Sequence, residues 1–225
     1  MSNPIKDLTR KEWMLWLGSL CIVILSNTLT ENMDILTLVA ACVGITSLIF
    51  AAKGNVCAQI LMVVFSVLYG IISWRFHYWG EMITYLGMAL PMAVWSTITW
   101  IKNPAPNGKE VAIQKLKPRH ILGVIVFAAV ATCLFYRILD ALNTPHILFS
   151  TISIATSVLA ATLTMLRSSY YALGYASNDI VLIILWTLAS MENPVYIPVV
   201  VNFAIFFFND MYGFLCWKRR EKISC

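Results

Sequence analysis

Eight apolar runs follow one another along this chain, each about as long as a helix that crosses a lipid bilayer. Short turns rich in charge, Asn, Gly or Pro separate the runs, and only residues 102–120 form a long connection. The expected spans are Trp13–Leu29, Ile35–Ala52, Val56–Phe76, Met82–Ile101, Ile121–Leu139, Ile147–Leu166, Tyr171–Met191 and Val195–Trp217. The sequence therefore predicts an all-α integral membrane protein with about eight spanning helices.

The composition agrees with lipid as the solvent. Hydrophobic residues make up 60% of the 225 residues and charged residues 12%, whereas charged residues are roughly a quarter of an average soluble domain. Spans and turns use nearly the whole chain, so residues 1–225 are expected to form one membrane domain. We find no HExxH, P-loop or GxSxG motif, and therefore expect no catalytic residue, no metal and no cofactor.

The cysteines show no CxxC spacing and lie mostly inside the apolar runs. We expect them to be free thiols that pack as small apolar side chains. They are Cys21, Cys42, Cys57, Cys133, Cys216 and Cys225.

The basic residues indicate the orientation of the chain, because Lys and Arg in short loops favour the cytoplasmic side. With the N-terminus inside, only Arg75 and Arg137 of the 16 Lys and Arg residues fall outside. This sorting predicts that both ends are cytoplasmic, and it explains the net charge of +5 without a nucleic-acid partner. Trp100 and Trp217, at the inner ends of two spans, are interpreted as membrane-interface residues.

The order of the spans suggests two parallel repeats of three helices, a SWEET-like 3+1+3 arrangement with an extra leading helix. The expected segments are an extra N-terminal helix (13–29), a first three-helix repeat (34–101), a basic cytoplasmic loop (102–120), a linking helix (121–140), a second three-helix repeat (146–217) and a cytoplasmic tail (218–225). Pro91 and Pro198 are expected inside spans, where each leaves the carbonyl four residues earlier, at Gly87 and Pro194, without its helical partner.

Polar residues inside the spans are the candidate solute-binding groups, since such residues are costly in hydrocarbon and usually face a cavity or another helix. The pairs Asn178-Asp179 and Asn209-Asp210 lie at similar depths in the last two spans, and Asn202, Phe206, Asn209 and Tyr212 share one helical face. Amides suit a hydroxyl-rich solute, and rings can stack on a flat base. The candidate binding residues are Gln59, Tyr69, Tyr175, Asn178, Asp179, Trp186, Asn202, Phe206, Asn209 and Tyr212.

Other roles remain open for these residues. Ser, Thr and Asn also join helices to one another by hydrogen bonds. Asp179 and Asp210 could join helices, bind a cation or relay a proton. An ion-coupled symporter that uses both aspartates, and a membrane receptor that binds a ligand without moving it, are therefore alternatives.

Several short motifs stand out in the two halves of the chain. Those of the first half are Tyr78-Trp79-Gly80-Glu81, Leu90-Pro91-Met92 and Trp100-Ile101-Lys102-Asn103-Pro104. Those of the second half are Leu166-Arg167, Val199-Val200-Val201-Asn202-Phe203 and Phe208-Asn209-Asp210-Met211-Tyr212-Gly213-Phe214 followed by Trp217-Lys218. Together these motifs resemble the PnuC-type nicotinamide riboside transporters. The likeness covers most of Asp34–Lys222, and the last span carries its most specific part.

The resemblance implies uptake of nicotinamide riboside across a bacterial cytoplasmic membrane by facilitated diffusion, with trapping by a cytoplasmic kinase, and a homotrimeric assembly. It also implies that Gln59 matches a ligand-binding glutamine and that a W-x-x-W-x-x-N ligand motif falls on Ala172, Tyr175 and Asn178. Both tryptophans of that motif are replaced here. Thiamine and riboflavin, which relatives of this fold carry, therefore remain alternative substrates.

Overall fold

The computed structural model describes residues 4–29, 34–75, 79–106, 108–144 and 146–223, and these are mostly helical. Tyr78 and Cys225 lie outside the described residues. The helices are α1 (Arg10–Thr28), α2 (Ile35–Ala52), α3 (Cys57–Arg75), α4 (Trp79–Thr84), the π-helical segment η1 (Tyr85–Ala89), α5 (Leu90–Lys102), α6 (Pro118–Ala141), α7 (Ile147–Met165), α8 (Tyr171–Glu192), the 3-10 turn η2 (Pro194–Tyr196) and α9 (Ile197–Ile223).

Seven helical segments of the described chain are long and apolar enough to cross a membrane. They are α2, α3, the continuous α4–η1–α5 segment, α6, α7, α8 and α9 with its leading turn. The eighth predicted span, α1, has 19 residues, but Arg10, Lys11 and Glu12 occupy its first turn and shorten its apolar part. The chain is therefore a multi-pass membrane protein, as the sequence predicted.

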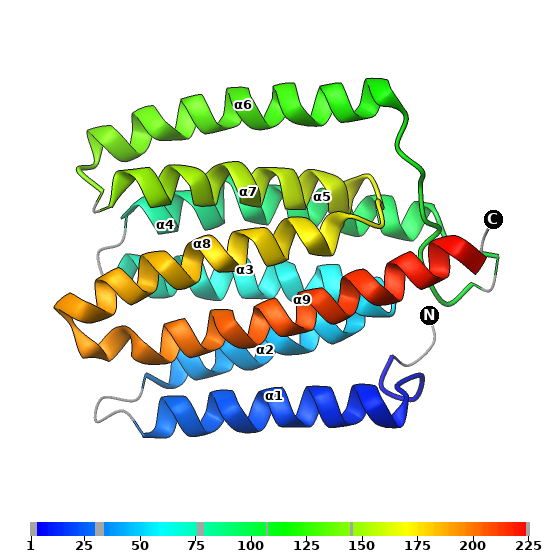
Figure 1. Ribbon diagram of the computed structural model, residues 1–225, viewed down its shortest axis with the longest axis horizontal. Helices are drawn as coiled ribbons and strands as arrows, with labels where there is room; N and C mark the ends of the chain where they lie inside the picture. Colours follow the sequence, from blue (N-terminus) through cyan, green and yellow to red (C-terminus); the bar gives the residue numbers. More distant parts are fainter. Residues whose placement is uncertain (1–3, 30–33, 76–78, 107, 145, 224–225) are drawn as a thin grey trace.

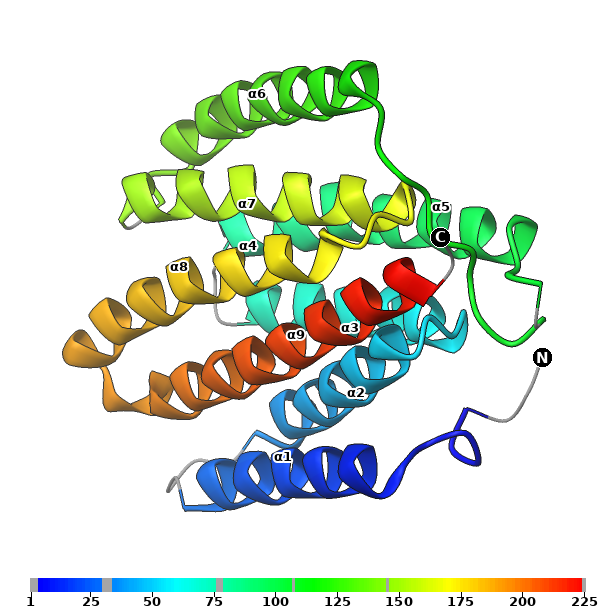
Figure 2. The same cartoon turned by 45° about the vertical axis from the view of Figure 1, so that its right-hand side comes forward.

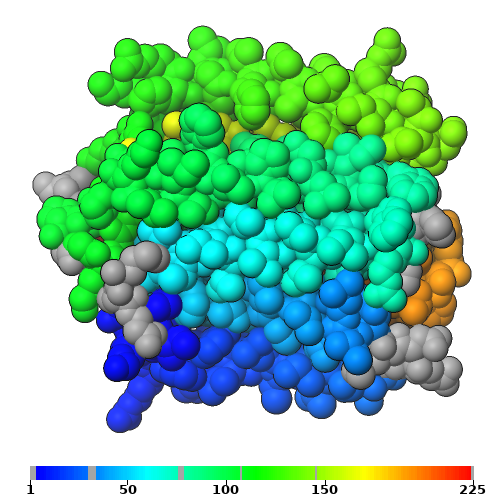
Figure 3. All heavy atoms as spheres, turned by 180° about the vertical axis from the view of Figure 1, so that it is seen from behind, coloured from blue at the N-terminus to red at the C-terminus, as the bar shows by residue number. Residues whose placement is uncertain are grey.

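The helices lie side by side in one bundle, with α6 on one flank and α1 on the other (Figure 1). α6 packs on α7, whereas α1 packs on α2 and α9. Seen from behind, the surface passes from α6 across α5 and α3 to α2 and α1 (Figure 3). The predicted triples correspond to α2–α5 and α7–α9, which meet where α2 packs on α9 and α5 on α7. The repeat relation between the triples stays a prediction.

The start of α1 and the end of α9 lie at the same end of the bundle (Figure 2). We call this the basic end, because the Lys53 turn, the connection from Asn103 to Lys117 and the Arg167 turn also lie there. Several hydrogen bonds join these segments, including the Val111 amide to the Gly54 carbonyl at 2.9 Å and the Gln114 amide to the Arg167 carbonyl at 3.0 Å. The other end, with the α8–α9 turn, is called the opposite end.

Trp100 and Trp217 are not membrane-interface residues, contrary to the sequence prediction. Both are fully buried, and their ring centroids lie 5.5 Å apart. The Trp100 indole donates to the Thr164 carbonyl at 2.9 Å, and the Trp217 indole donates to the Ala51 carbonyl at 2.8 Å. These carbonyls belong to the last turns of α7 and α2, where the helix itself offers no amide donor to the final carbonyls. Each tryptophan therefore forms a hydrogen bond from one triple to the other at the basic end.

The two prolines differ in their effect on the backbone. Before Pro91, the chain forms the π-helical segment η1, in which the Leu90 amide donates to the Tyr85 carbonyl five residues earlier. This wider turn is compatible with Pro91, which has no backbone N–H to donate, and it changes the direction of the side chains of η1. Pro198 instead lies in the first turn of α9, where a proline removes no helical hydrogen bond. The Pro194 carbonyl accepts a hydrogen bond from the Ile197 amide. The prediction that this carbonyl lacks a partner was therefore wrong.

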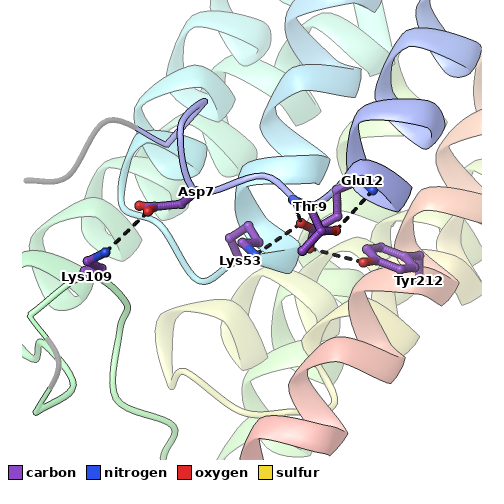
Figure 4. Close-up of polar contacts among 6 residues, drawn as sticks. All are labelled: Asp7, Thr9, Glu12, Lys53, Lys109 and Tyr212. Carbon is purple, nitrogen blue, oxygen red and sulfur yellow. Dashed lines mark hydrogen bonds and ion pairs between the residues drawn. The ribbon is translucent and has the colours of Figure 1, made fainter.

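A buried carboxylate docks α1 onto the bundle at the basic end (Figure 4). Glu12 is 4% exposed and accepts from the Thr9 amide at 2.7 Å, from Lys53 Nζ at 3.1 Å and from the Tyr212 hydroxyl at 3.1 Å. Figure 4 also shows the ion pair between Asp7 and Lys109, at 3.4 Å, which is more exposed. Glu12 thus connects the first turn of α1 to α9 and to the turn after α2.

We expect Glu12→Ala to destabilise the protein by about 1–3 kcal/mol, because it leaves the Lys53 amine and the Tyr212 hydroxyl without their buried partner. The matched control is Asp7→Ala, which breaks an exposed ion pair worth at most about 1 kcal/mol. Thermal unfolding in detergent measures both. Equal midpoints for Glu12→Ala and the wild type would show that Glu12 does not hold α1.

Candidate functional site

A buried cavity lies between α2, α3, the α4–η1–α5 segment, α7, α8 and α9, with residues of both triples in its wall. It is narrow, at about 70 Å³, compared with roughly 300–1,000 Å³ for pockets that bury drug-sized ligands. A larger solute therefore requires the surrounding side chains or helices to move apart. The lining residues are Gly44, Leu48, Gln59, Met62, Phe65, Ser66, Thr84, Tyr85, Met88, Ala89, Met92, Ala93, Ser96, Ser157, Ala161, Tyr175, Asn178, Asp179, Phe203, Phe206 and Asp210.

Asn178 presents a fixed amide to this cavity. Its Oδ1 lies 2.8 Å from the Thr156 hydroxyl and 3.3 Å from the Ser153 hydroxyl, which both donate to it from α7. With the carbonyl oxygen held in this way, Nδ2 is the group that remains to donate to a ligand. Ser153 and Thr156 of α7 thus join this helix to α8 and orient Asn178.

Asp179 and Asp210 form a buried carboxyl pair in the same wall, each 4% exposed. The two side chains share a hydrogen bond between α8 and α9. Asp179 Oδ2 is buried and accepts no hydrogen bond from an amide, hydroxyl or cationic group of the described residues. No lysine, arginine or histidine is among the described residues that line the cavity, so this wall is polar and acidic.

Aromatic rings form the facing part of the cavity. Phe65 of α3 lies 6.0 Å from Tyr85 of η1 and 6.0 Å from Phe206 of α9, both edge to face, measured between ring centroids. Tyr175 adds a ring from α8. Such a ring cluster next to an amide and carboxyl groups suits a flat, polar, ring-containing solute.

Of the ten residues predicted to bind a solute, five line this cavity: Gln59, Tyr175, Asn178, Asp179 and Phe206. Tyr69 lies beside it, with its ring centroid 4.3 Å from that of Tyr85. Trp186 lines a second cavity at the opposite end. The remaining three, Asn202, Asn209 and Tyr212, lie outside the cavity wall, on the face of α9 that meets α1.

The polar stripe of α9 therefore contacts a helix in this structure. Asn209 Nδ2 donates to the Ser19 hydroxyl at 3.0 Å, and Asn202 Oδ1 accepts from Asn27 at 3.4 Å. Tyr212 donates to Glu12, as described above. Helical spacing grouped Asn202, Asn209 and Tyr212 with Phe206, but Phe206 lines the cavity while the other three contact α1. Spacing alone could not tell which side chains of the stripe meet a cavity and which meet another helix.

The sequence interpretation missed Tyr85, Thr84 and Met88, which the π-helical segment turns into the cavity. A signal for them was present, because Pro91 predicts an altered turn before it. Asp210 was proposed for ion coupling rather than for solute binding, and it lines the cavity beside Asp179.

The second cavity, at the opposite end, is wider, at about 450 Å³. Its rings are Trp79, Trp186 and Tyr196, and its charged groups are Glu81 and Glu192, with His146 beside Glu192. No lysine or arginine is among its described lining residues. No group of three His, Cys, Asp or Glu that could hold a metal ion occurs in the described part of the chain.

A multi-pass helical bundle with a polar cavity between two helix triples has the architecture of a solute transporter. Residues 34–219 match the family model for the nicotinamide mononucleotide transporter. The chain belongs to this family.

Two relatives are each named nicotinamide riboside transporter PnuC. The protein from Neisseria mucosa is 26% identical over 190 residues, covering 82% of this chain and 72% of the relative. The protein from Haemophilus influenzae is 24% identical over 189 residues, covering 83% and 80%. The crystal structure of the vitamin B3 transporter PnuC has the same fold, with a TM-score of 0.81, 23% identity, and coverage of 95% of this chain and 92% of that one.

We expect Asn178→Ala to weaken solute binding at least tenfold, about 1.4 kcal/mol, because it removes the oriented amide. The matched control is Asn209→Ala, which removes the same group from the α1 contact and should lower thermal stability instead of affinity. Calorimetric titration and thermal unfolding of both variants separate the two effects. Equal losses of affinity would contradict the assignment of Asn178, and not Asn209, to the cavity.

Proposed function

We propose that this protein carries nicotinamide riboside across the bacterial cytoplasmic membrane. The observation that carries the proposal is the cavity itself, in which an oriented amide, the Gln59 amide and five aromatic rings lie between the two triples. Amides match the carboxamide and ribose hydroxyls of this solute, and rings match its flat base. The names of the two PnuC relatives support the same substrate.

The cavity favours the riboside over the mononucleotide for which the family is named. A phosphate group requires cationic side chains or a helix N-terminus, and the described lining residues offer two carboxyl groups and no lysine or arginine. A phosphate placed beside Asp179 and Asp210 would meet like charge in a medium of low polarity. Dephosphorylated substrate is therefore the better fit.

We further propose facilitated diffusion, with trapping of the solute by a cytoplasmic kinase and no chemical step in this chain. The basic end is assigned to the cytoplasm, because loops rich in Lys and Arg remain there. Both termini are then cytoplasmic. A homotrimer, as the family resemblance implies, is the proposed assembly.

Purified protein in liposomes should exchange labelled nicotinamide riboside in the absence of ATP and of any ion gradient. Liposomes without protein and liposomes with Asn178→Ala are the controls, and unlabelled thiamine, riboflavin and nicotinamide mononucleotide are tested as competitors. We expect competition by the unlabelled riboside and little by the mononucleotide. No exchange of the riboside would overturn the proposal, and exchange of thiamine or riboflavin alone would replace its substrate.

A second candidate is an ion-coupled symporter, favoured by the buried Asp179–Asp210 pair. In that case uptake into liposomes should exceed equilibration and collapse when the proton or sodium gradient is dissipated. Under facilitated diffusion, the same treatment leaves the exchange rate unchanged.

A further inference from the structure

We infer that the Asp179–Asp210 pair selects solutes by positive charge, so that this transporter takes a flat ring bearing a permanent cation and rejects the neutral ring of the same shape. The inference rests on the proposed function and names the residues that determine its specificity. It starts from the position of the pair, in the wall of the central cavity and between two helices of the second triple.

The pair carries charge that the protein does not neutralise within the cavity. A hydrogen bond between two carboxyl groups requires one proton between them, and two carboxylates this close do not both ionise. The pair with one shared proton has a single negative charge. No lysine, arginine or histidine stands among the described residues of the cavity wall to balance it, and an unbalanced buried charge is costly. A cationic solute supplies the missing counter-charge.

Asp179 has unused capacity to accept a hydrogen bond or to pair with a cation at the cavity wall. Asp179 is 4% exposed, it lines the cavity, and its Oδ2 has no hydrogen-bond partner among the described residues. Buried polar atoms nearly always have a partner, so a lone carboxylate oxygen at a cavity wall indicates a place for a ligand group.

The rings next to the pair define the shape of the cation. Tyr175 is four residues before Asp179 on α8, so their side chains share one helical face, and both line the cavity. A flat ring that stacks near Tyr175 would bring its charge close to Asp179. Because the charge of a pyridinium ring is spread over the ring, it needs no hydrogen-bond donor to interact with a carboxylate. An ammonium ion would instead demand several acceptors.

The cavity at the opposite end is also lined by acidic and aromatic residues. It combines Trp79, Trp186 and Tyr196 with Glu81 and Glu192, and the Glu192 side chain is 76% exposed. Acidic residues in a concave, partly apolar site concentrate cations locally, and aromatic faces attract them. Two cavities with acids and rings, and without lysine or arginine among their described residues, suit the passage of an aromatic cation.

The test uses nicotinamide riboside and its reduced 1,4-dihydro form, which keep the same ribose and carboxamide but differ in ring charge. Binding of both forms is measured by calorimetric titration in detergent, and transport by exchange in liposomes. For the wild type we expect the oxidised cation to bind at least tenfold more tightly than the neutral form. For the Asp179→Asn/Asp210→Asn double variant we expect this ratio to fall toward one, because it removes the single negative charge of the pair while preserving its shape. Each single Asn variant keeps one carboxylate and should retain a ratio closer to that of the wild type.

The matched control is Asp140→Asn, an exposed aspartate on α6 outside both cavities, which should keep the wild-type ratio. Asn178→Ala should weaken the binding of both forms to the same extent, since both carry the same carboxamide. Thermal unfolding verifies that each variant is folded. If an aspartate variant does not fold, the inference is tested by the ratio of the wild-type affinities for the oxidised and reduced forms alone.

Equal binding of the two forms by the wild type would overturn the inference and leave nicotinamide riboside transport intact. A wild-type ratio that persists in the folded Asp179→Asn/Asp210→Asn double variant would also overturn it, because the selection would then lie elsewhere. Binding of neither form would instead overturn the proposed function, and the inference with it.

Discussion

In hydrocarbon a polar group has no water to bind, so every buried donor and acceptor must find its partner inside the bundle. This constraint sorts the polar side chains of the protein into two groups. Trp100, Trp217 and Asn209 donate across helix contacts, and their donors are used in packing. Asn178 keeps one amide group free, and Asp179 keeps one oxygen free, both at the cavity wall. Asn178 and Asp179 thus offer hydrogen-bonding groups where a solute can bind, although Asn209 Oδ1 and Thr132 Oγ1, outside the cavity, also lack a partner among the described residues.

The same constraint explains the docking of α1, which precedes the residues that match the family model. An added helix must satisfy the polar groups on the face that it covers. Ser19 and Asn27 provide partners for the asparagines of α9, and Glu12 provides one for Tyr212. The polar stripe of α9 is therefore explained without a ligand, and α1 is a structural part of this bundle rather than a loose anchor.

The sequence predicted the membrane class and most of the helices, because each span must be apolar over a length set by the bilayer. Half of the residues that it predicted to bind a solute line the cavity, including Gln59 and Asn178. It failed where the outcome depends on which helices become neighbours. Trp100 has the spacing of an interface residue but meets Trp217 in the interior. Tyr85 has no polar periodicity around it and enters the cavity only because the backbone before Pro91 forms a π-helical segment.

The missing tryptophans of the W-x-x-W-x-x-N motif have a structural explanation. Ala172 is fully buried where α8 packs against α9, and a Cβ placed on Gly213 would lie 3.6 Å from the Cβ of Ala172. Small residues on both helices let them approach closely, so a tryptophan at 172 would push α8 and α9 apart. Those helices carry Asp179 and Asp210, whose hydrogen bond depends on that approach. In this chain the rings are supplied instead by Phe65, Tyr85, Tyr175 and Phe206. Ala172 is thus compatible with the close packing of α8 and α9 on which the contact between the two carboxyl groups rests.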